Sequence, residues 1–377
     1  MVAVKVALQV DQLFLNAPGG IGTYIRNLVP ALANRDPSVE LTLFHSRFDS
    51  PDPPEPWIRE HPTHELRGRM RSLYLRWNVV GRPPLPAPLA GADIVHVTNH
   101  AGVAPAGARQ RLVVTVHDLA FDVLPGAFPP RWRVVYRLGL RAAVRRADAI
   151  VTPSRTTAED LLSRTAVDPS KLHVVPLAAS LPAGKLDADD VLARLKIRGP
   201  YVLFVGTLEP RKNLVRLVRA YRRVAAEGFP HALVLAGPLG WQHESLMREL
   251  ALQGPGEIVM TGEISADELD AVYRAADVFA YPSLYEGFGL PVLEALVRGI
   301  PTVASNTSAV PEVSGDAALG VDPRSVRSIA QAISSLVSDV GLADRMAARA
   351  RAQAQRFSWD ETARLTLQVY ERVLGEK

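Results

Sequence analysis

Short runs of consecutive apolar residues recur along the chain, separated by longer stretches in which apolar positions have helical spacing. In the first half these runs lie at residues 4–10, 41–44, 94–97, 112–116, 150–152 and 174–176. Strands that are apolar throughout, rather than at every second position, are typical of parallel sheets covered by helices on both faces. The pattern therefore predicts a doubly wound α/β domain over residues 1–180.

The same alternation begins again after residue 200, with apolar runs at residues 201–205, 232–235, 257–260, 278–281 and 301–304. A polar segment at about residues 178–200 resembles a linker. With 377 residues in the chain, two domains are the natural expectation. The second domain is expected over residues 200–357, and an amphipathic helix is expected from Ser358, its N-cap, to the end of the chain.

Composition narrows the class of protein. The chain has no cysteine, which excludes disulfides, thiolate metal sites and a cysteine nucleophile. Hydrophobic residues make up 47% and charged residues 22%, close to globular averages, so a disordered or fibrous protein is excluded. The first apolar run is interrupted at Asp11, too early for a signal peptide or a membrane span. We therefore expect a cytoplasmic protein.

The positive charge is clustered rather than spread. One stretch contains Arg67, Arg69, Arg71, Arg76 and Arg82, and a second contains Arg133, Arg137, Arg141 and Arg145 at every fourth position, with Trp132 and Tyr136 among them. A helical stripe of this kind is either a solvated face or a surface that meets an anionic membrane. Peripheral contact at the inner face of a membrane is therefore a hypothesis for this protein.

A glycine-rich segment follows the first predicted strand. Gly19, Gly20 and Gly22 lie where that strand gives way to a helix, so their N–H groups and the helix dipole favour contact with a phosphate. A plain tight turn is the structural alternative. The spacing differs from G-x-G-x-x-G, and no acid stands out after the second strand, which argues against an NAD site.

The corresponding loop of the second half follows the run at 201–205. It contains Gly206 and Thr207 and ends with the adjacent cations Arg211 and Lys212. A guanidinium can bind a phosphate through two donors while an ammonium adds a point charge, so this pair suits a diphosphate. A solvated basic turn is the alternative interpretation.

Residues 281–294 carry the most specific pattern in the chain. Pro291 marks the first turn of a helix, and the glycines before it free the loop so that the N–H groups of Phe288, Gly289 and Leu290 can point at one ligand. Glu286 and Glu294 are eight residues apart, which allows two separate contacts with hydroxyl groups. For Glu294 the structural alternative is an acid that stabilises the beginning of a helix.

Five segments in this order resemble the family-4 retaining glycosyltransferases of the GT-B fold. They are the glycine-rich segment at 19–22, Val-His-Asp at 116–118, the loop at 206–213, Val-Met-Thr-Gly at 259–262, and the two glutamates with the Ala-Leu that follows Glu294. The resemblance covers nearly the whole chain. It implies two Rossmann-like domains facing a central cleft, with the acceptor on the first, the nucleotide sugar on the second, and a C-terminal helix that returns to the first.

The resemblance also implies roles for individual residues. Glu286 and the N–H groups of Phe288 and Gly289 would hold the transferred sugar, and Glu294 would hold the ribose. Arg211 and Lys212 would bind the diphosphate, and Gly20 would close on it from the first domain. Thr261, Gly262 and Ile264 would form part of the base pocket. His117 would contact the donor sugar. His96 and His100 are interpreted as structural, with contact to the acceptor as the alternative.

The implied activity is transfer of a hexose, with retention and without a metal ion or cofactor. The pattern at 206–213 and 286–294 looks most like bacterial mannosyltransferases of polysaccharide assembly, so GDP-mannose is the preferred donor and a UDP-hexose the next. The acceptor would be a glycan or a lipid-linked sugar, and no nucleic acid is expected as a partner. The D-x-D at Asp187 to Asp189 is interpreted as solvated charge.

Three alternatives to this activity stay open. They are a GT-B epimerase that acts on a sugar nucleotide, a phosphorylase that uses pyridoxal phosphate, and a catalytically silent subunit that binds a nucleotide or a partner enzyme.

Overall fold

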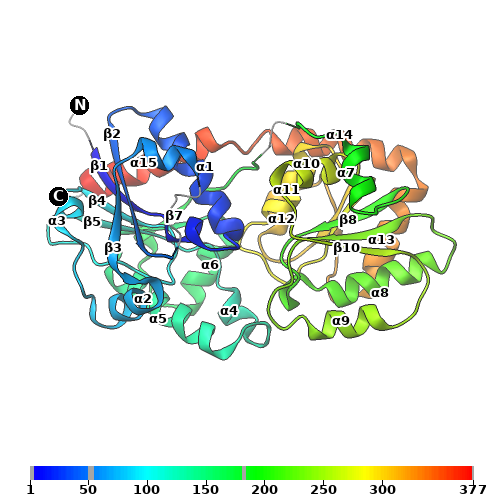
Figure 1. The fold of residues 1–377 in the computed structure, drawn as a ribbon, viewed down its shortest axis with the longest axis horizontal. Coiled ribbons are helices and arrows are strands. Elements are labelled where there is room, and N and C mark those ends of the chain that lie inside the picture. Colours follow the sequence, from blue (N-terminus) through cyan, green and yellow to red (C-terminus); the bar gives the residue numbers. More distant parts are fainter. Residues whose placement is uncertain (1–3, 50–54, 181–183, 376–377) are drawn as a thin grey trace. The chain divides into compact units, whose positions relative to one another are not determined.

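The computed structural model describes residues 4–49, 55–180 and 184–375, which form two compact units. Unit 1 comprises residues 1–122, 130–178 and 357–377, and unit 2 comprises residues 123–129 and 179–356. Each unit contains a parallel β-sheet covered by helices (Figure 1).

The described part of unit 1 has seven strands in the order β3-β2-β1-β4-β5-β6-β7. Their bounds are β1 Val4–Gln9, β2 Val39–Arg47, β3 Thr63–Arg69, β4 Ile94–Val97, β5 Arg111–Thr115, β6 Ala149–Thr152 and β7 Leu172–Val174. All neighbouring pairs are parallel; for example, Val6 of β1 lies opposite Leu41 of β2 and Ile94 of β4. The central strands are buried along their whole length, as the continuous apolar runs predicted.

Helices cover both faces of this first sheet. They are α1 Gly19–Arg35, α2 Met70–Val80, α3 Ala87–Ala90, α4 Ala120–Val123, α5 Pro130–Arg146, α6 Arg155–Arg164 and α15 Trp359–Gly375, with short 3-10 turns at Asp11–Phe14, Pro56–Glu60 and Pro169–Lys171. The 3-10 turn at Pro125–Ala127 belongs to unit 2. Figure 1 shows α1 and α15 on one side of the sheet and α2 and α5 on the other.

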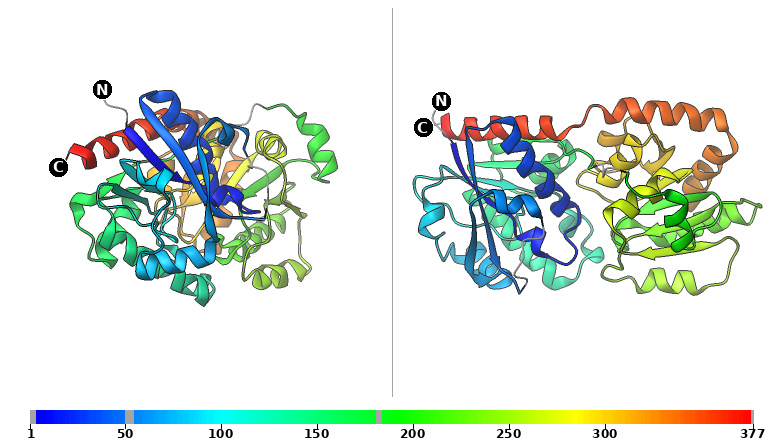
Figure 2. Two further views of the ribbon diagram at one scale, coloured as in Figure 1. Left: turned by 60° about the vertical axis from the view of Figure 1, so that its left-hand side comes forward. Right: turned by 45° about the horizontal axis from the view of Figure 1, so that its top comes forward.

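The C-terminal helix α15 belongs to unit 1, as the sequence predicted, and packs along α1 (Figure 2). Ser358 begins it as expected, because its hydroxyl accepts a hydrogen bond from the N–H of Glu361 at 3.1 Å. The hydroxyl of Tyr370 lies 2.6 Å from Nδ1 of His96, in the middle of the sheet. A helix from the end of the chain is thus bonded to a strand from its first hundred residues.

Unit 2 has six described strands in the order β10-β9-β8-β11-β12-β13. Their bounds are β8 Tyr201–Val205, β9 Ala232–Ala236, β10 Ile258–Gly262, β11 Val278–Tyr281, β12 Thr302–Ser305 and β13 Leu319–Val321. The helices are α7 Ala188–Arg194, α8 Leu214–Ala225, α9 Glu244–Ala251, α10 Ala266–Arg274, α11 Leu290–Val297, α12 Val310–Ser314, α13 Val326–Ser338 and α14 Val340–Ala354, with a 3-10 turn at Pro210–Lys212.

In unit 2, the parallel direction of two neighbouring strands determines where the candidate site lies. Strands β8 and β11 are neighbours and parallel, with Val202 opposite Val278, although more than 70 residues separate them in the sequence. Their carboxyl ends therefore open at the same edge of the sheet, where ligands bind in folds of this kind.

The segment expected to be a linker contains a helix. Helix α7 lies within residues 178–200 and packs against α10, so most of this segment is part of unit 2. The carboxylate of Asp187 accepts hydrogen bonds from the N–H groups of Asp189 and Asp190 and caps α7. The polar composition that suggested a linker thus marks an exposed helix and its cap.

Candidate active site

Two cations and a carboxylate form a buried cluster in unit 2. Lys212 Nζ donates to Glu286 Oε1 at 2.7 Å, and Arg211 Nη1 donates to Glu286 Oε2 at 2.6 Å. The cations come from the turn after β8, and Glu286 comes from the loop after β11. The structure thus brings together three of the residues that the sequence singled out, and it does so through direct ion pairs.

Two further side chains complete this cluster, and the sequence did not single them out. Glu209 Oε1 accepts from Nε and Nη2 of Arg211 at 3.0 and 2.7 Å, and the hydroxyl of Tyr281 lies 2.6 Å from Lys212 Nζ. All five side chains are at least 85% buried. With two cations and two carboxylates, the cluster is electrically neutral in itself.

The ion pairs control the charge of Glu286. Burial alone would raise the pKa of this carboxyl, but Arg211 and Lys212 outweigh burial and lower the pKa to about 2. Burial lowers the pKa of Lys212, and Arg211 adds to this effect, whereas Glu286 opposes it. Glu286 is therefore ionised at any physiological pH and can accept hydrogen bonds from hydroxyl groups.

Lys212 has donor capacity left for an anion. Its ammonium group has three N–H donors, and two of them bind Tyr281 and Glu286. Within the described residues, no acceptor meets the third donor. A phosphate oxygen at this position would gain a charge-assisted hydrogen bond without breaking the existing pairs.

Asn213 joins the two loops that supply the cluster. Its side-chain amide donates to the carbonyl oxygens of Pro282 at 2.9 Å and Pro323 at 2.6 Å, and its backbone has a φ of 63°, in the left-handed region. Asparagine tolerates this conformation better than most residues. The N–H of Leu284 also bonds to the carbonyl of Arg211 at 2.9 Å, so the loops hold one another in place.

Helix α11 begins where the sequence predicted. Gly289 is its N-cap, with a φ of 105° that only glycine adopts readily, and Pro291 lies in the first turn. Phe288 and Leu290 are buried beside it. The N–H groups of Val292 and Leu293 are bonded to the carbonyl of Gly289, and the positive end of the dipole at this helix start favours an anion or an oxygen-rich ligand.

Glu294 lies one turn into α11, apart from the ion-pair cluster. Its Oε2 accepts a hydrogen bond from the hydroxyl of Tyr273 at 3.0 Å. Burial raises the pKa of Glu294 to about 7, although Tyr273 and Arg298 act in the opposite direction. This carboxyl therefore changes charge near neutral pH.

Gly206 and Thr207 lie at the carboxyl end of β8, and Thr261 and Gly262 lie at that of β10, with Ile264 just beyond. The N–H of Gly206 is already bonded to the carbonyl of Ala236 at 2.9 Å, so it continues the sheet. Thr261 donates to the carbonyl of Gly262. Thr261, Gly262 and Ile264 are all partly exposed, at the same edge of the sheet as the ion-pair cluster.

The glycine-rich segment of unit 1 is helical, whereas the sequence suggested a loop. Helix α1 begins at Gly19 and contains Gly20 and Gly22 in its first turn. A Cβ on Gly22 would lie 2.2 Å from Cβ of Pro18, so the close approach of the preceding proline requires this glycine. The N–H of Gly22 is bonded to the carbonyl of Pro18 at 3.0 Å, so the capacity for an anion at this helix start lies with the N–H groups of Gly19 and Gly20.

His117 follows β5 at the carboxyl edge of the first sheet. Its Nε2 lies 2.9 Å from the carbonyl oxygen of Thr98, and its ring meets that of Tyr24 edge-on at 5.0 Å. Because a carbonyl can only accept, Nε2 carries the proton. Burial lowers the pKa of His117, so the neutral ring leaves Nδ1 as an acceptor for a hydroxyl group.

The other two histidines of this region are buried. His96 is bonded through both ring nitrogens, to Tyr370 and to Thr115, which supports its structural interpretation. His100 packs against the rings of Phe121 and Tyr136, which stack on each other, and neither of its nitrogens has a partner in the described structure.

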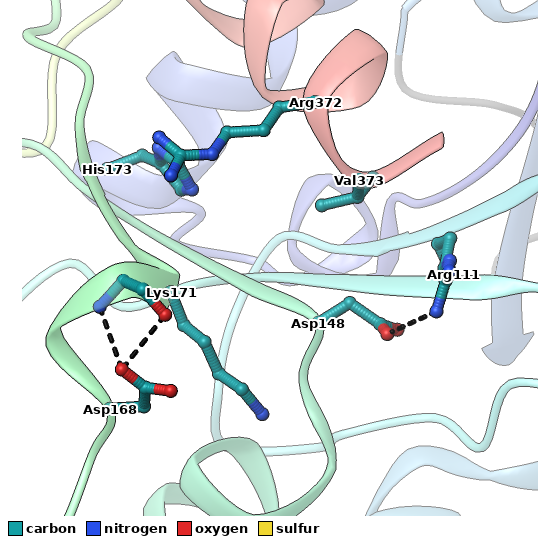
Figure 3. A pocket seen from close by; sticks show the side chains of 8 residues that line it. Arg111, Asp148, Asp168, Lys171, His173, Arg372 and Val373 are labelled. Carbon is teal, nitrogen blue, oxygen red and sulfur yellow. Dashed lines mark hydrogen bonds and ion pairs between the residues drawn. The ribbon is translucent and has the colours of Figure 1, made fainter. Parts of the chain in front are cut away.

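A charged cavity in unit 1 lies at the opposite edge of its sheet (Figure 3). Arg111 begins β5, Asp148 precedes β6 and Lys171 precedes β7, so these residues mark the amino ends of the strands. Arg111 is paired with Asp148 at 3.0 Å, and Lys171 donates to the carbonyl of Ala147. Its charges are thus engaged within unit 1, at the edge where such sheets do not bind ligands.

No group of three or more potential metal ligands occurs within the described ranges. No helix there is both long and apolar enough to cross a membrane.

Comparison with known protein families gives two matches that together cover most of the chain. Residues 193–353 match the model described as glycosyl transferases group 1, and residues 18–181 match the model described as glycosyltransferase family 4.

Similar curated proteins are named as transferases of sugars. The O-antigen chain mannosyltransferase B of Escherichia coli is 34% identical over an alignment of 269 positions that covers 69% of this chain and 70% of the relative. The D-inositol 3-phosphate glycosyltransferase of Salinispora tropica is 31% identical over an alignment of 407 positions, gaps included, that covers 95% of this chain and 82% of the relative.

Solved structures share the fold over the whole chain. Sucrose-phosphate synthase from Thermosynechococcus elongatus has a TM-score of 0.75 at 21% identity, covering 99% of this chain and 100% of that structure. Anabaena HepE in complex with UDP and glucose has a TM-score of 0.70 at 16% identity, covering 98% of this chain and 99% of that structure.

Proposed function

The chain belongs to the family-4 glycosyltransferases of the GT-B fold, and from this we propose that it transfers a hexose, mannose before others, from a nucleoside-diphosphate sugar with retention. The observation that supports the proposal is the buried cluster of Arg211, Lys212 and Glu286. It presents cations suited to a diphosphate and a carboxylate suited to sugar hydroxyls at the carboxyl end of two adjacent strands.

In the proposed reaction, the bond between the anomeric carbon and the diphosphate oxygen breaks, and the acceptor hydroxyl bonds to the same face of the sugar. The departing diphosphate takes the proton of that hydroxyl. Its growing negative charge is stabilised by Arg211, by the third donor of Lys212 and by the N-terminus of α11. No metal ion is assigned a role in this scheme.

The donor sugar is held by fixed hydrogen-bonding groups. Glu286 is ionised and accepts hydrogen bonds from sugar hydroxyls, while Glu294 receives the hydroxyls of the ribose. Nδ1 of His117 would accept a further sugar hydroxyl. GDP-mannose is the preferred donor because of the similarity to O-antigen chain mannosyltransferase B, and UDP-hexoses come next because HepE was solved with UDP and glucose.

A panel of nucleotide sugars tests the donor. We expect GDP-mannose and GDP to raise the melting temperature more than UDP-glucose and UDP, since a ligand at 100 times its Kd stabilises a protein by about 2.7 kcal/mol. Lys212→Ala should abolish the shift, while Arg248→Ala, an exposed cation of the same unit, should leave it unchanged. The anomeric configuration of the product, read by NMR, tests retention.

Two outcomes would contradict the transferase proposal. Conversion of a sugar nucleotide without any acceptor would favour an epimerase, and nucleotide binding without turnover would favour a silent subunit.

The acceptor is proposed to be a glycan or a lipid-linked sugar, reached through peripheral contact of unit 1 with an anionic membrane. Helices α2 and α5 pack against each other and contain no acidic residue. Large apolar side chains are exposed on both helices, namely Leu75, Val79, Val80, Trp132, Val134 and Val135. Exposed arginines lie beside them, including Arg71, Arg76, Arg141 and Arg145, whereas Arg137 is paired with Asp122 and Arg133 is half-buried.

Apolar side chains among arginines suit the boundary between anionic headgroups and acyl chains. Vesicle sedimentation tests this surface. Binding to vesicles with phosphatidylglycerol, its loss at high salt, and its reduction by Trp132→Glu are expected, while Leu252→Glu on unit 2 should have no effect. Equal binding to neutral vesicles would exclude this surface.

A further inference from the structure

Tyr273 lies behind the carboxylate that is proposed to bind the ribose. It comes from α10, and its side chain is 1% exposed. Its hydroxyl donates to Glu294 Oε2 at 3.0 Å and also lies 3.4 Å from the carbonyl oxygen of Pro291. Oε1 of Glu294 has no hydrogen-bond partner among the residues placed by the structure. One oxygen is therefore held and the other is left for a ligand.

Arg298, the residue directly after α11 and its C-cap, holds the ring of Tyr273 in place. Its guanidinium lies 4.7 Å from the centre of the tyrosine ring, and its Nη1 donates to the carbonyl oxygen of Glu294 at 2.9 Å. Stacking of a guanidinium on an aromatic face is a stabilising cation–π contact. Arg298 thus connects the tyrosine and the backbone of the glutamate that it supports.

Asp270 anchors Arg298 from the other side. Its Oδ1 accepts from Nε and Nη2 of Arg298 at 3.1 and 2.5 Å, and its Oδ2 accepts from Nε of Arg274 at 2.8 Å. Asp270 is 4% exposed. Helix α10 therefore supplies Asp270, Tyr273 and Arg274, and helix α11 and its C-cap supply Glu294 and Arg298. The charged groups around Glu294 are engaged with one another.

The surroundings of Tyr273 keep its hydroxyl protonated, so that it acts as a hydrogen-bond donor. Burial, followed by the nearby Glu294, raises the pKa of Tyr273 well above its usual value, so the hydroxyl stays protonated. A hydroxyl that donates to a carboxylate favours its ionised form and opposes the burial that raises the pKa of Glu294. Without this donor, Glu294 would be protonated over a wider pH range and free to rotate.

We propose that Tyr273, braced by Arg298 and Asp270, is a positioning residue that orients Glu294 and favours its ionised form for binding the ribose diol of the donor. The inference rests on the proposed function, because it assumes a ribonucleotide at Glu294. It goes further by assigning a specific role to three residues that do not touch the donor. It also predicts that Tyr273 affects only the binding of the ribose. Binding of the transferred hexose and of the phosphates should not depend on it.

Tyr273→Phe tests the proposal because it removes the hydroxyl and keeps the ring under Arg298. Calorimetry would measure the Kd of GDP and UDP and of their 2′,3′-dideoxy forms. We expect the Kd of the better ribonucleotide to rise about 10-fold or more, as for a lost hydrogen bond to a charged group, while the Kd of its dideoxy form stays unchanged. The pH below which ribonucleotide affinity declines should move upward in the variant.

Two further variants control this test. Tyr221→Phe removes a buried hydroxyl of the same unit that binds the carbonyls of His231 and Glu257, and it should change none of the four constants. Arg298→Lys keeps a cation beside Asp270 but loses the planar stacking, so it should weaken ribonucleotide binding in the same direction as Tyr273→Phe.

The outcomes separate this inference from the proposed function. An equal loss for ribo and dideoxy forms in Tyr273→Phe would mean a general structural role and would overturn the inference, as would unchanged binding of both. A wild-type protein that binds none of the four nucleotides would instead overturn the proposed function, and the inference with it.

Discussion

Lys212 Nζ and Glu286 Oε1 lie 2.7 Å apart in the interior of unit 2, where each side chain is at least 92% buried. Removing one member of such a pair leaves the other as an uncompensated buried charge, which costs far more than an exposed ion pair contributes. A substitution at either residue is therefore expected to change both the stability of unit 2 and the proposed binding of the donor.

Glu286→Gln is predicted to lower kcat/KM for the sugar donor by about 100-fold or more, because it removes the charged group that is proposed to bind the reacting sugar. It should also lower the melting temperature, since Lys212 loses its carboxylate partner and Arg211 keeps only Glu209. Steady-state kinetics and thermal denaturation measure the two effects. Glu227→Gln, at an exposed position of the same unit, should change neither.

Glu294→Gln is predicted to stabilise the ligand-free protein at pH 8 and to leave it unchanged at pH 5. The pKa of Glu294 is raised from 4.5 to about 7, so the folded state holds the proton more tightly than the unfolded state. The free energy of unfolding therefore falls as the pH rises through this range, by at most about 3 kcal/mol. Melting temperatures at the two pH values test this, and an equal difference at both would contradict it.

Two substitutions at Asn213 separate the contribution of its side-chain hydrogen bonds from that of its left-handed backbone conformation. Asn213→Gly should lower the free energy of unfolding by about 1–3 kcal/mol, because the carbonyls of Pro282 and Pro323 lose their donor. Asn213→Ala should cost about 1 kcal/mol more, because alanine is strained at a φ of 63°. Urea denaturation measures both variants, and equal values for the two would exclude the strain.

Tyr370→Phe is predicted to loosen α15. The change leaves Nδ1 of His96 buried without a partner, which costs about 1–3 kcal/mol. Amide hydrogen exchange should accelerate along α15 and in β4. Helices α8 and α13 of unit 2 serve as the internal reference, and acceleration there as well would mean a general loss of stability.

Apolar patterning predicted most of the fold, and its failures have physical causes. The buried strands appear as continuous apolar runs, but β3 was missed because it is a polar edge strand in which only Leu66 is buried. The three-residue strand β13 contains a glycine and is too short to form a pattern. The glycines at 19–22 suggested a loop, since nothing in the sequence shows the contact between Gly22 and Pro18.

The sequence indicated individual residues of the candidate site, but not the ion pairs and hydrogen bonds that join them. Strand ends indicated Arg211, Lys212 and Glu286, yet their direct pairing depends on β8 and β11 being neighbours. Glu209 and Asn213 flank the cations, and an acid and an asparagine beside a basic turn were a signal that could have been used. Tyr273 had no such signal, because its contact with Glu294 depends on how the consecutive helices α10 and α11, which flank β11 in the sequence, lie in space.

Helix α15 gives unit 1 an unusual order of assembly. Its other elements all precede residue 179, but the partner of His96 is Tyr370. During synthesis on the ribosome, the first sheet lacks helix α15 until all of unit 2 has been translated. Unit 1 is thus the first to begin folding and the last to be completed.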